Sequence, residues 1–107
     1  MKFLLLLKER AQRPDVVDPA AFNRVVREHV SRLLSNGTLD CAYYLLPKGG
    51  ACIINASSHE ALLQELRTWP GSSQHEFELH PLCDIFEAID DNYTRARAAS
   101  PPDPAKG

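Results

Sequence analysis

Apolar and polar positions along the chain predict an alternation of strands and helices. Residues 3–7 are apolar at every position. Because a strand sends successive side chains to opposite faces, both faces of this strand are expected to be buried. Asp18-Pro19 supplies an N-cap oxygen and a proline suited to the first helical turn. An apolar stripe at three- and four-residue spacing then runs through residues 22–33, and Asn36-Gly37 ends this helix with a left-handed cap.

The second half of the chain continues the alternation. Residues 38–46 and 50–56 are rich in strand formers, and the proline and glycines between them predict a hairpin connection. Ser57-Ser58-His59-Glu60 has the form of a capping box, so a second helix is expected to begin with Ser57 as its N-cap. Residues 75–85 alternate between apolar and polar side chains, which predicts a last strand, and Pro81 favours an edge position for it.

The resulting order, β-α-β-β-α-β, predicts an α+β ferredoxin-like fold in which both helices cover one face of an antiparallel sheet. The other face would expose one apolar row of the first strand, either Leu4 and Leu6 or Phe3, Leu5 and Leu7. Monomers rarely expose such a patch. Face-to-face pairing with a second copy is therefore expected, which makes the protein a homodimer or a higher homo-oligomer.

Length and composition narrow the classes of protein that fit. Residues 1–99 of the 107 are expected to form a single domain ending in a short helix, and residues 100–107 a disordered tail. The 12 basic and 14 acidic residues are scattered, with a formal net charge of −2, so nucleic acid is not an expected partner. No stretch approaches the ~20 apolar residues that span a bilayer, so a soluble protein with no membrane partner is expected. The cysteines lie in apolar segments without CxxC spacing, which favours a reducing cytoplasm.

A set of short motifs in a fixed order resembles muconolactone delta-isomerase and its relatives. These motifs are Glu28, Leu33, Gly37, Glu60-Ala61-Leu62, Leu66, Trp69-Pro70, Glu78-Leu79 and Leu82-Cys83. The resemblance spans residues 2–85 and implies the dimeric α+β barrel architecture, a group with cofactor-free isomerases, polyketide cyclases and quinone-forming monooxygenases. It allows oligomers larger than a dimer. The chain departs from the family at Asp40 and Tyr44, where basic residues are usual, so a substrate other than muconolactone is expected.

The resemblance implies a cofactor-independent isomerase or cyclase that acts by proton transfer on a small oxygenated cyclic or polyketide-like substrate. One alternative is a cofactor-free monooxygenase of phenolic or polyketide substrates, in which the base forms an anion that reacts with oxygen. Another is a non-catalytic dimer that binds a metabolite. Shifting a double bond beside a carbonyl requires a base and an acid with pKa values near the working pH, and histidine suits both roles. The catalytic candidates are His29, His80 and Glu28.

Each catalytic candidate has a structural alternative. His29 lies in the apolar stripe of the first helix and is expected to point at the sheet, as an acid/base or as a core histidine bonded to a backbone group. Glu28, which resembles the family's helical glutamate, flanks this stripe and is either a base or the ion-pair partner of an arginine at helical spacing. His80 shares a strand face with Glu78, which makes an oriented proton-transfer pair or an ordinary exposed edge.

Substrate binding is assigned to Tyr43, Tyr44 and Trp69. Tyr43 and Tyr44 point to opposite faces of their strand, so at most one is expected to line a given pocket. A tyrosine there offers a ring for stacking and a hydroxyl for binding an oxygen.

Cys52 and Cys83 are expected to be packing residues rather than nucleophiles, because nothing in the sequence puts a base beside them. His80 and Cys83 are three residues apart and His75 and His80 five apart, so each pair points to opposite faces of a strand. No metal site is therefore expected.

Overall fold

The computed structural model describes residues 1–12 and 14–99. The described strands are β1 (Lys2–Glu9), β2 (Leu39–Tyr44), β3 (Gly50–Asn55) and β4 (His75–Leu82). The described helices are α1 (Pro19–Ser35), α2 (His59–Arg67) and α3 (Ile85–Ala99), with a 3-10 turn η1 (Ser72–Gln74) before β4. The predicted disordered tail, residues 100–107, lies outside the described residues.

Strand β1 lies inside the sheet, whose order is β2-β3-β1-β4, and it pairs antiparallel with both β3 and β4. Leu5 at its centre is opposite Cys52 on one side and Leu79 on the other. This arrangement confirms the predicted α+β ferredoxin-like order and explains why β1 is apolar throughout. Strand β4 is at the edge, as Pro81 indicates.

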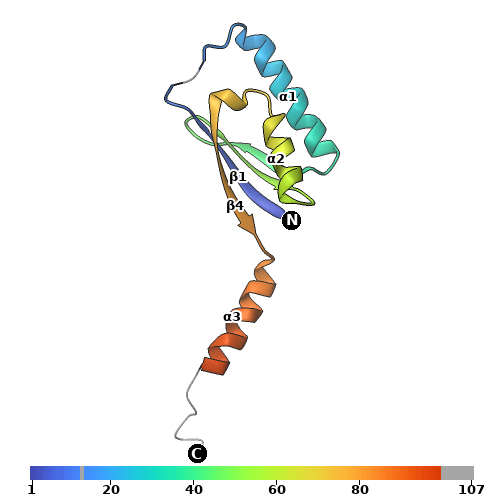
Figure 1. Cartoon of the computed structure of the whole chain (residues 1–107), viewed down its shortest axis with the longest axis vertical. Helices are drawn as coiled ribbons and strands as arrows, with labels where there is room; N and C mark the ends of the chain where they lie inside the picture. Colours follow the sequence, from blue (N-terminus) through green and yellow to red (C-terminus); the bar gives the residue numbers. More distant parts are fainter. Residues whose placement is uncertain (13, 100–107) are drawn as a thin grey trace, which may run out of the picture.

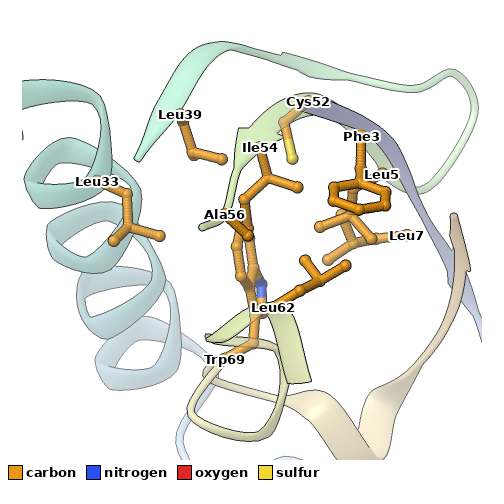
Figure 2. Close-up of a cluster of buried hydrophobic side chains, with 10 residues drawn as sticks. All are labelled: Phe3, Leu5, Leu7, Leu33, Leu39, Cys52, Ile54, Ala56, Leu62 and Trp69. Carbon is orange, nitrogen blue, oxygen red and sulfur yellow. The ribbon is translucent and has the colours of Figure 1, made fainter. Parts of the chain in front are cut away.

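The core lies between the sheet and the helices α1 and α2, which cover one face of it (Figure 1). Phe3, Leu5 and Leu7 alternate along β1 and share the face that packs against these helices. They are buried in one cluster with Leu33 of α1 and Leu62 of α2 (Figure 2). The apolar stripes of the two helices therefore pack against the same face of the sheet.

The helix starts follow from side-chain caps. Asp18 accepts a hydrogen bond from the Ala21 amide at 3.0 Å, as Asp18-Pro19 predicts. In α2 the prediction of Ser57 as the N-cap is wrong by one residue, because the Ser58 hydroxyl accepts from the Ala61 amide at 3.1 Å. The Ser58 backbone is still extended, with φ −156° and ψ 167°, which leaves Ser57 outside the helix.

Among the described residues, apolar side chains outside this core lie on the other face of the sheet and on α3. On the face opposite the helices, Leu4 and Leu6 of β1 are half-buried, as is Ile53 of β3 opposite Leu4. Helix α3 runs away from the sheet beyond β4 (Figure 1), and none of its residues is buried. Within the part of the chain that the structure describes, no helix is long and apolar enough to cross a membrane.

Candidate functional site

Helix α1 packs closely against the sheet only along its C-terminal half. His29 and Leu33 are buried there, whereas Phe22 and Val26 of the N-terminal half are half-buried. Between this N-terminal half and the sheet lies a cavity of about 980 Å³. Phe22 and Val26 line it from the helix side, and the buried Trp69 contributes to its wall. Its volume is at the upper end of the range for small-molecule sites.

Polar groups gather among the residues that line this cavity. Glu9, at the end of β1, and Lys48, in the β2–β3 hairpin, form an ion pair with 3.6 Å between Nζ and Oε2. Gln74 is buried, and its Nε2 donates to the Pro14 carbonyl at 2.7 Å, which fixes the loop before α1 against η1. The site thus combines apolar walls with a few fixed polar groups, as small-molecule sites usually do.

His75, the first residue of β4, lines the cavity and is half-buried. Its Nδ1 lies 3.1 Å from the Gly71 carbonyl oxygen. Because a carbonyl can only accept, this bond requires the proton on Nδ1 of the neutral ring, and Nε2 then carries the lone pair. In the neutral ring, Nε2 of His75 is therefore the nitrogen that can accept a proton, as a general base must.

The turn that provides this carbonyl depends on glycine. Gly71 has a φ of 72°, in the left-handed region that favours glycine. A Cβ added to it would lie 2.3 Å from Cζ of Phe22, so the turn and the cavity wall of α1 touch here. Gly71 thus orients the ring of His75 through its carbonyl group and lies against the side chain of Phe22.

The three predicted substrate-binding residues, Tyr43, Tyr44 and Trp69, all line the cavity. The expectation that at most one of Tyr43 and Tyr44 lines a given pocket is therefore wrong, although the two residues alternate along β2. The Tyr44 hydroxyl donates to the Pro47 carbonyl at 2.9 Å, which leaves its oxygen able to accept. Cys52 also lines the cavity, and burial raises the pKa of its thiol to about 11, so it is protonated near neutral pH, consistent with a packing role.

His29, a predicted catalytic residue, is buried but does not line the cavity. Arg32 donates to its Nδ1 at 2.9 Å, which puts the ring proton on Nε2, and Nε2 is buried without a hydrogen-bond partner among the described residues. Its ring meets Trp69 edge to face at 4.8 Å between centroids. Burial, and then the Arg32 charge, lower the pKa of His29, while Glu65 acts in the opposite direction. The surroundings of His29 are those of a neutral core histidine.

The other two predicted catalytic residues lie elsewhere on the surface. Glu28 is exposed on α1 and does not line the cavity. His80 is exposed on the helix-free face of β4, where its Nε2 lies 3.6 Å from Glu78. Lys8 is the main cause that lowers the pKa of Glu78, ahead of His80. The structure therefore brings the three binding candidates to one cavity and leaves the three catalytic candidates outside it.

Sequence reasoning missed His75 as a site residue, although a signal was available. His75, Phe77 and Leu79 occupy alternate positions of β4 and share the core face. Phe77 is opposite Leu7 of β1, and Leu79 is opposite Leu5. A histidine in the first position of a core-facing row is a candidate for a pocket wall.

Among the described residues, no group of three or more His, Cys, Asp or Glu side chains could hold a metal ion.

The fold is shared with a known enzyme. The crystal structure of muconolactone isomerase at 3.3 Å resolution superposes with a TM-score of 0.66 and 23% sequence identity, covering 78% of this chain and 90% of that chain. The chain therefore has a muconolactone isomerase-like fold. No protein-family model and no curated protein matches the chain. At this level of identity the likeness establishes the fold, and the activity has to be argued from the site.

Proposed function

We propose that the protein is a cofactor-independent isomerase or cyclase that transfers protons at a carbon beside a carbonyl group. The substrate is a small oxygenated cyclic or polyketide-like molecule bound in the cavity between α1 and the sheet. The observation that carries the proposal is His75 on the cavity wall, with Nδ1 bonded to Gly71 and a lone pair on Nε2. The muconolactone isomerase-like fold supports the same reaction class.

In the proposed reaction, Nε2 of His75 removes a proton from the carbon next to the carbonyl, and the electron pair of the broken C–H bond forms an enolate. For an isomerisation, the imidazolium returns the proton to another carbon of the conjugated system. For a cyclisation, the enolate carbon attacks a second carbonyl carbon, and the imidazolium protonates the new alkoxide. Lys48, on the same cavity, provides a positive charge that can stabilise the oxyanion.

The size of the cavity favours the larger members of this substrate class. A volume of about 980 Å³ accommodates a molecule of several rings. Trp69 and Phe22 offer aromatic surface to such rings. A monocyclic lactone would leave most of the apolar wall unfilled, so we propose a multi-ring or extended polyketide-like substrate.

The decisive experiment follows loss of the acidic C–H signal in deuterated buffer by NMR. The probes are a monocyclic butenolide, a tricyclic anthrone and an aromatic β-polyketone. We expect exchange of the larger probes, and a fall of about 10²–10⁴-fold in its rate for His75→Gln. His80→Gln is the matched control, because His80 is exposed on the other face of the sheet.

Other outcomes separate the alternatives. Exchange that persists in His75→Gln and is lost in His29→Gln would contradict the role of His75. Oxygen consumption in a closed cell would indicate a monooxygenase, and saturable binding without exchange or oxygen uptake would indicate a metabolite-binding protein.

The proposed active form is a homodimer or a higher homo-oligomer. The half-buried row of Leu4 and Leu6, together with Ile53, is an apolar surface on the sheet face that α1 and α2 leave free. Pairing these faces between two copies would remove the apolar surface from water.

A further inference from the structure

Helix α3 is an amphipathic helix whose apolar residues are turned to solvent. It follows β4 after the short link Cys83-Asp84 and extends away from the rest of the chain (Figure 1). Phe86, Ile89 and Tyr93 are 71%, 51% and 61% exposed. An isolated helix of this length is marginally stable in water, so α3 gains from packing its apolar side against a partner.

The apolar positions of α3 have the spacing of a two-helix seam. Phe86, Ile89, Tyr93 and Ala96 follow one another at intervals of three, four and three residues. This is the a and d pattern of a heptad repeat, which keeps one stripe facing a second helix. This spacing puts the apolar side chains on one side of α3, where a second helix can cover them.

The charges of α3 are separated along its length. Glu87, Asp90 and Asp91 lie in the first half, and Arg95 and Arg97 in the second. Asp91 and Arg95 form an ion pair within the helix at 2.9 Å, yet their side chains stay 60% and 80% exposed. Two copies of α3 in antiparallel orientation would set each acidic half beside the basic half of the other, whereas a parallel pair would set like charges together.

We propose that α3 pairs with α3 of a second copy of this chain in an antiparallel helix pair. One stripe meets its own equivalent across a two-fold axis, which is the self-complementary contact of a symmetric dimer. This contact is separate from the helix-free face of the sheet. A protein that used both contacts would link face-to-face dimers into a larger assembly.

The mass of the full-length protein in solution tests the contact. Ile89→Asp puts a charge in the centre of the stripe, and Thr94→Asp adds the same charge beside it on an exposed position. By light scattering, we expect Ile89→Asp to lower the mass about twofold, and Thr94→Asp to keep the wild-type mass. Equal masses for wild type and Ile89→Asp would overturn the proposal, whether α3 then binds another protein or none.

Cross-linking tests the orientation and does not depend on the mass measurement. Phe86→Cys and Ala96→Cys are made separately in a chain with Cys41 and Cys83 replaced by serine, and then mixed. An antiparallel pair brings position 86 of one copy near position 96 of the other, so the mixture should form a disulfide-linked dimer and each variant alone should not. Self-linking of Phe86→Cys would indicate a parallel pair, and the absence of any linked dimer would indicate that α3 does not pair with itself.

Discussion

Two histidines illustrate how one hydrogen bond determines what a side chain can do. Arg32 donates to Nδ1 of His29, so the proton of His29 lies on an Nε2 that has no hydrogen-bond partner in the part of the chain that the structure describes. The Gly71 carbonyl accepts from Nδ1 of His75, so the lone pair of the neutral ring lies on Nε2, and His75 lines the cavity. Only the second ring can accept a proton from a bound molecule without losing its existing bond.

The sequence predicts the burial of His29 but not these partners. An apolar stripe at helical spacing shows that His29 faces the core. The tautomer of His75 depends on a backbone carbonyl four residues earlier, in a turn whose left-handed Gly71 sets its direction. Side-chain periodicity contains no information on where a turn directs its carbonyl groups, so the sequence pattern points to positions on α1 and β4 that do not line the cavity.

The lowered pKa of His29 predicts a pH dependence of stability. The unfolded ring has a pKa of 6.5 and the folded ring a lower one, so the unfolded state binds more protons between these values. The contribution of His29 to the free energy of unfolding is therefore present above pH 6.5, and it is lost as the pH decreases towards the folded pKa. We expect His29→Phe to reduce this loss, measured by urea denaturation at pH 7.5, 6.5 and 5.5. Parallel stability curves for wild type and His29→Phe would contradict the assignment, and the exposed His80→Gln provides the control.

At the scale of elements, the positions of strands and helices follow from local chemistry. The wrong N-cap predicted for α2 shows where local chemistry is not sufficient. Ser57 and Ser58 both precede α2, and Glu60 favours Ser57 as the cap. The Ala56 amide is still bonded to the Met1 carbonyl at 2.9 Å, and the backbone stays extended through Ser58. A contact with Met1, distant in sequence and just before β1, thus delays the helix by one residue.

This cap gives a prediction with a matched control. Ser58→Ala removes the oxygen that accepts from the Ala61 amide, and it should lower the free energy of unfolding by about 1 kcal/mol. Ser57→Ala, one residue earlier, should leave it nearly unchanged. Urea denaturation of both variants measures the difference, and a larger loss in Ser57→Ala would restore the sequence-based cap.

The cavity depends on the way α1 diverges from the sheet, which the continuous stripe of α1 does not predict. Gly71→Ala tests the contact between Gly71 and Phe22 of α1, because the added Cβ would overlap Phe22 at 2.3 Å and would strain a φ of 72°. Gly37→Ala is the control, since its φ is 81° and a Cβ there would meet nothing within 4 Å. We expect both variants to lose about 1 kcal/mol from backbone strain. Gly71→Ala should lose more, and with it the proton exchange attributed to His75; equal losses would show that Phe22 yields freely.

At the scale of the whole molecule, residues 1–12 and 14–99 form a core and leave apolar surfaces on the sheet and on α3 without a partner. The sheet face around Leu6 and the α3 stripe around Ile89 belong to different elements. The first was predicted from β1, whose side chains are apolar on both faces. The second was not, because residues 87–99 were expected to be a short helix within the domain, and nothing in a helix pattern shows whether its apolar side meets its own domain or another chain.

The two surfaces should act independently, and the last prediction separates them. Leu6→Lys puts a charge in the centre of the helix-free sheet face, opposite Glu78 of the neighbouring strand, so the fold should tolerate it. If the sheet faces pair, this variant should lower the mass about twofold by light scattering, as Ile89→Asp does for α3, and the double variant should be monomeric. Leu46→Lys is the control, since Leu46 is 83% exposed in the β2–β3 hairpin. An unchanged mass in Leu6→Lys would mean that the sheet face stays in water, and the homodimer would then rest on α3 alone.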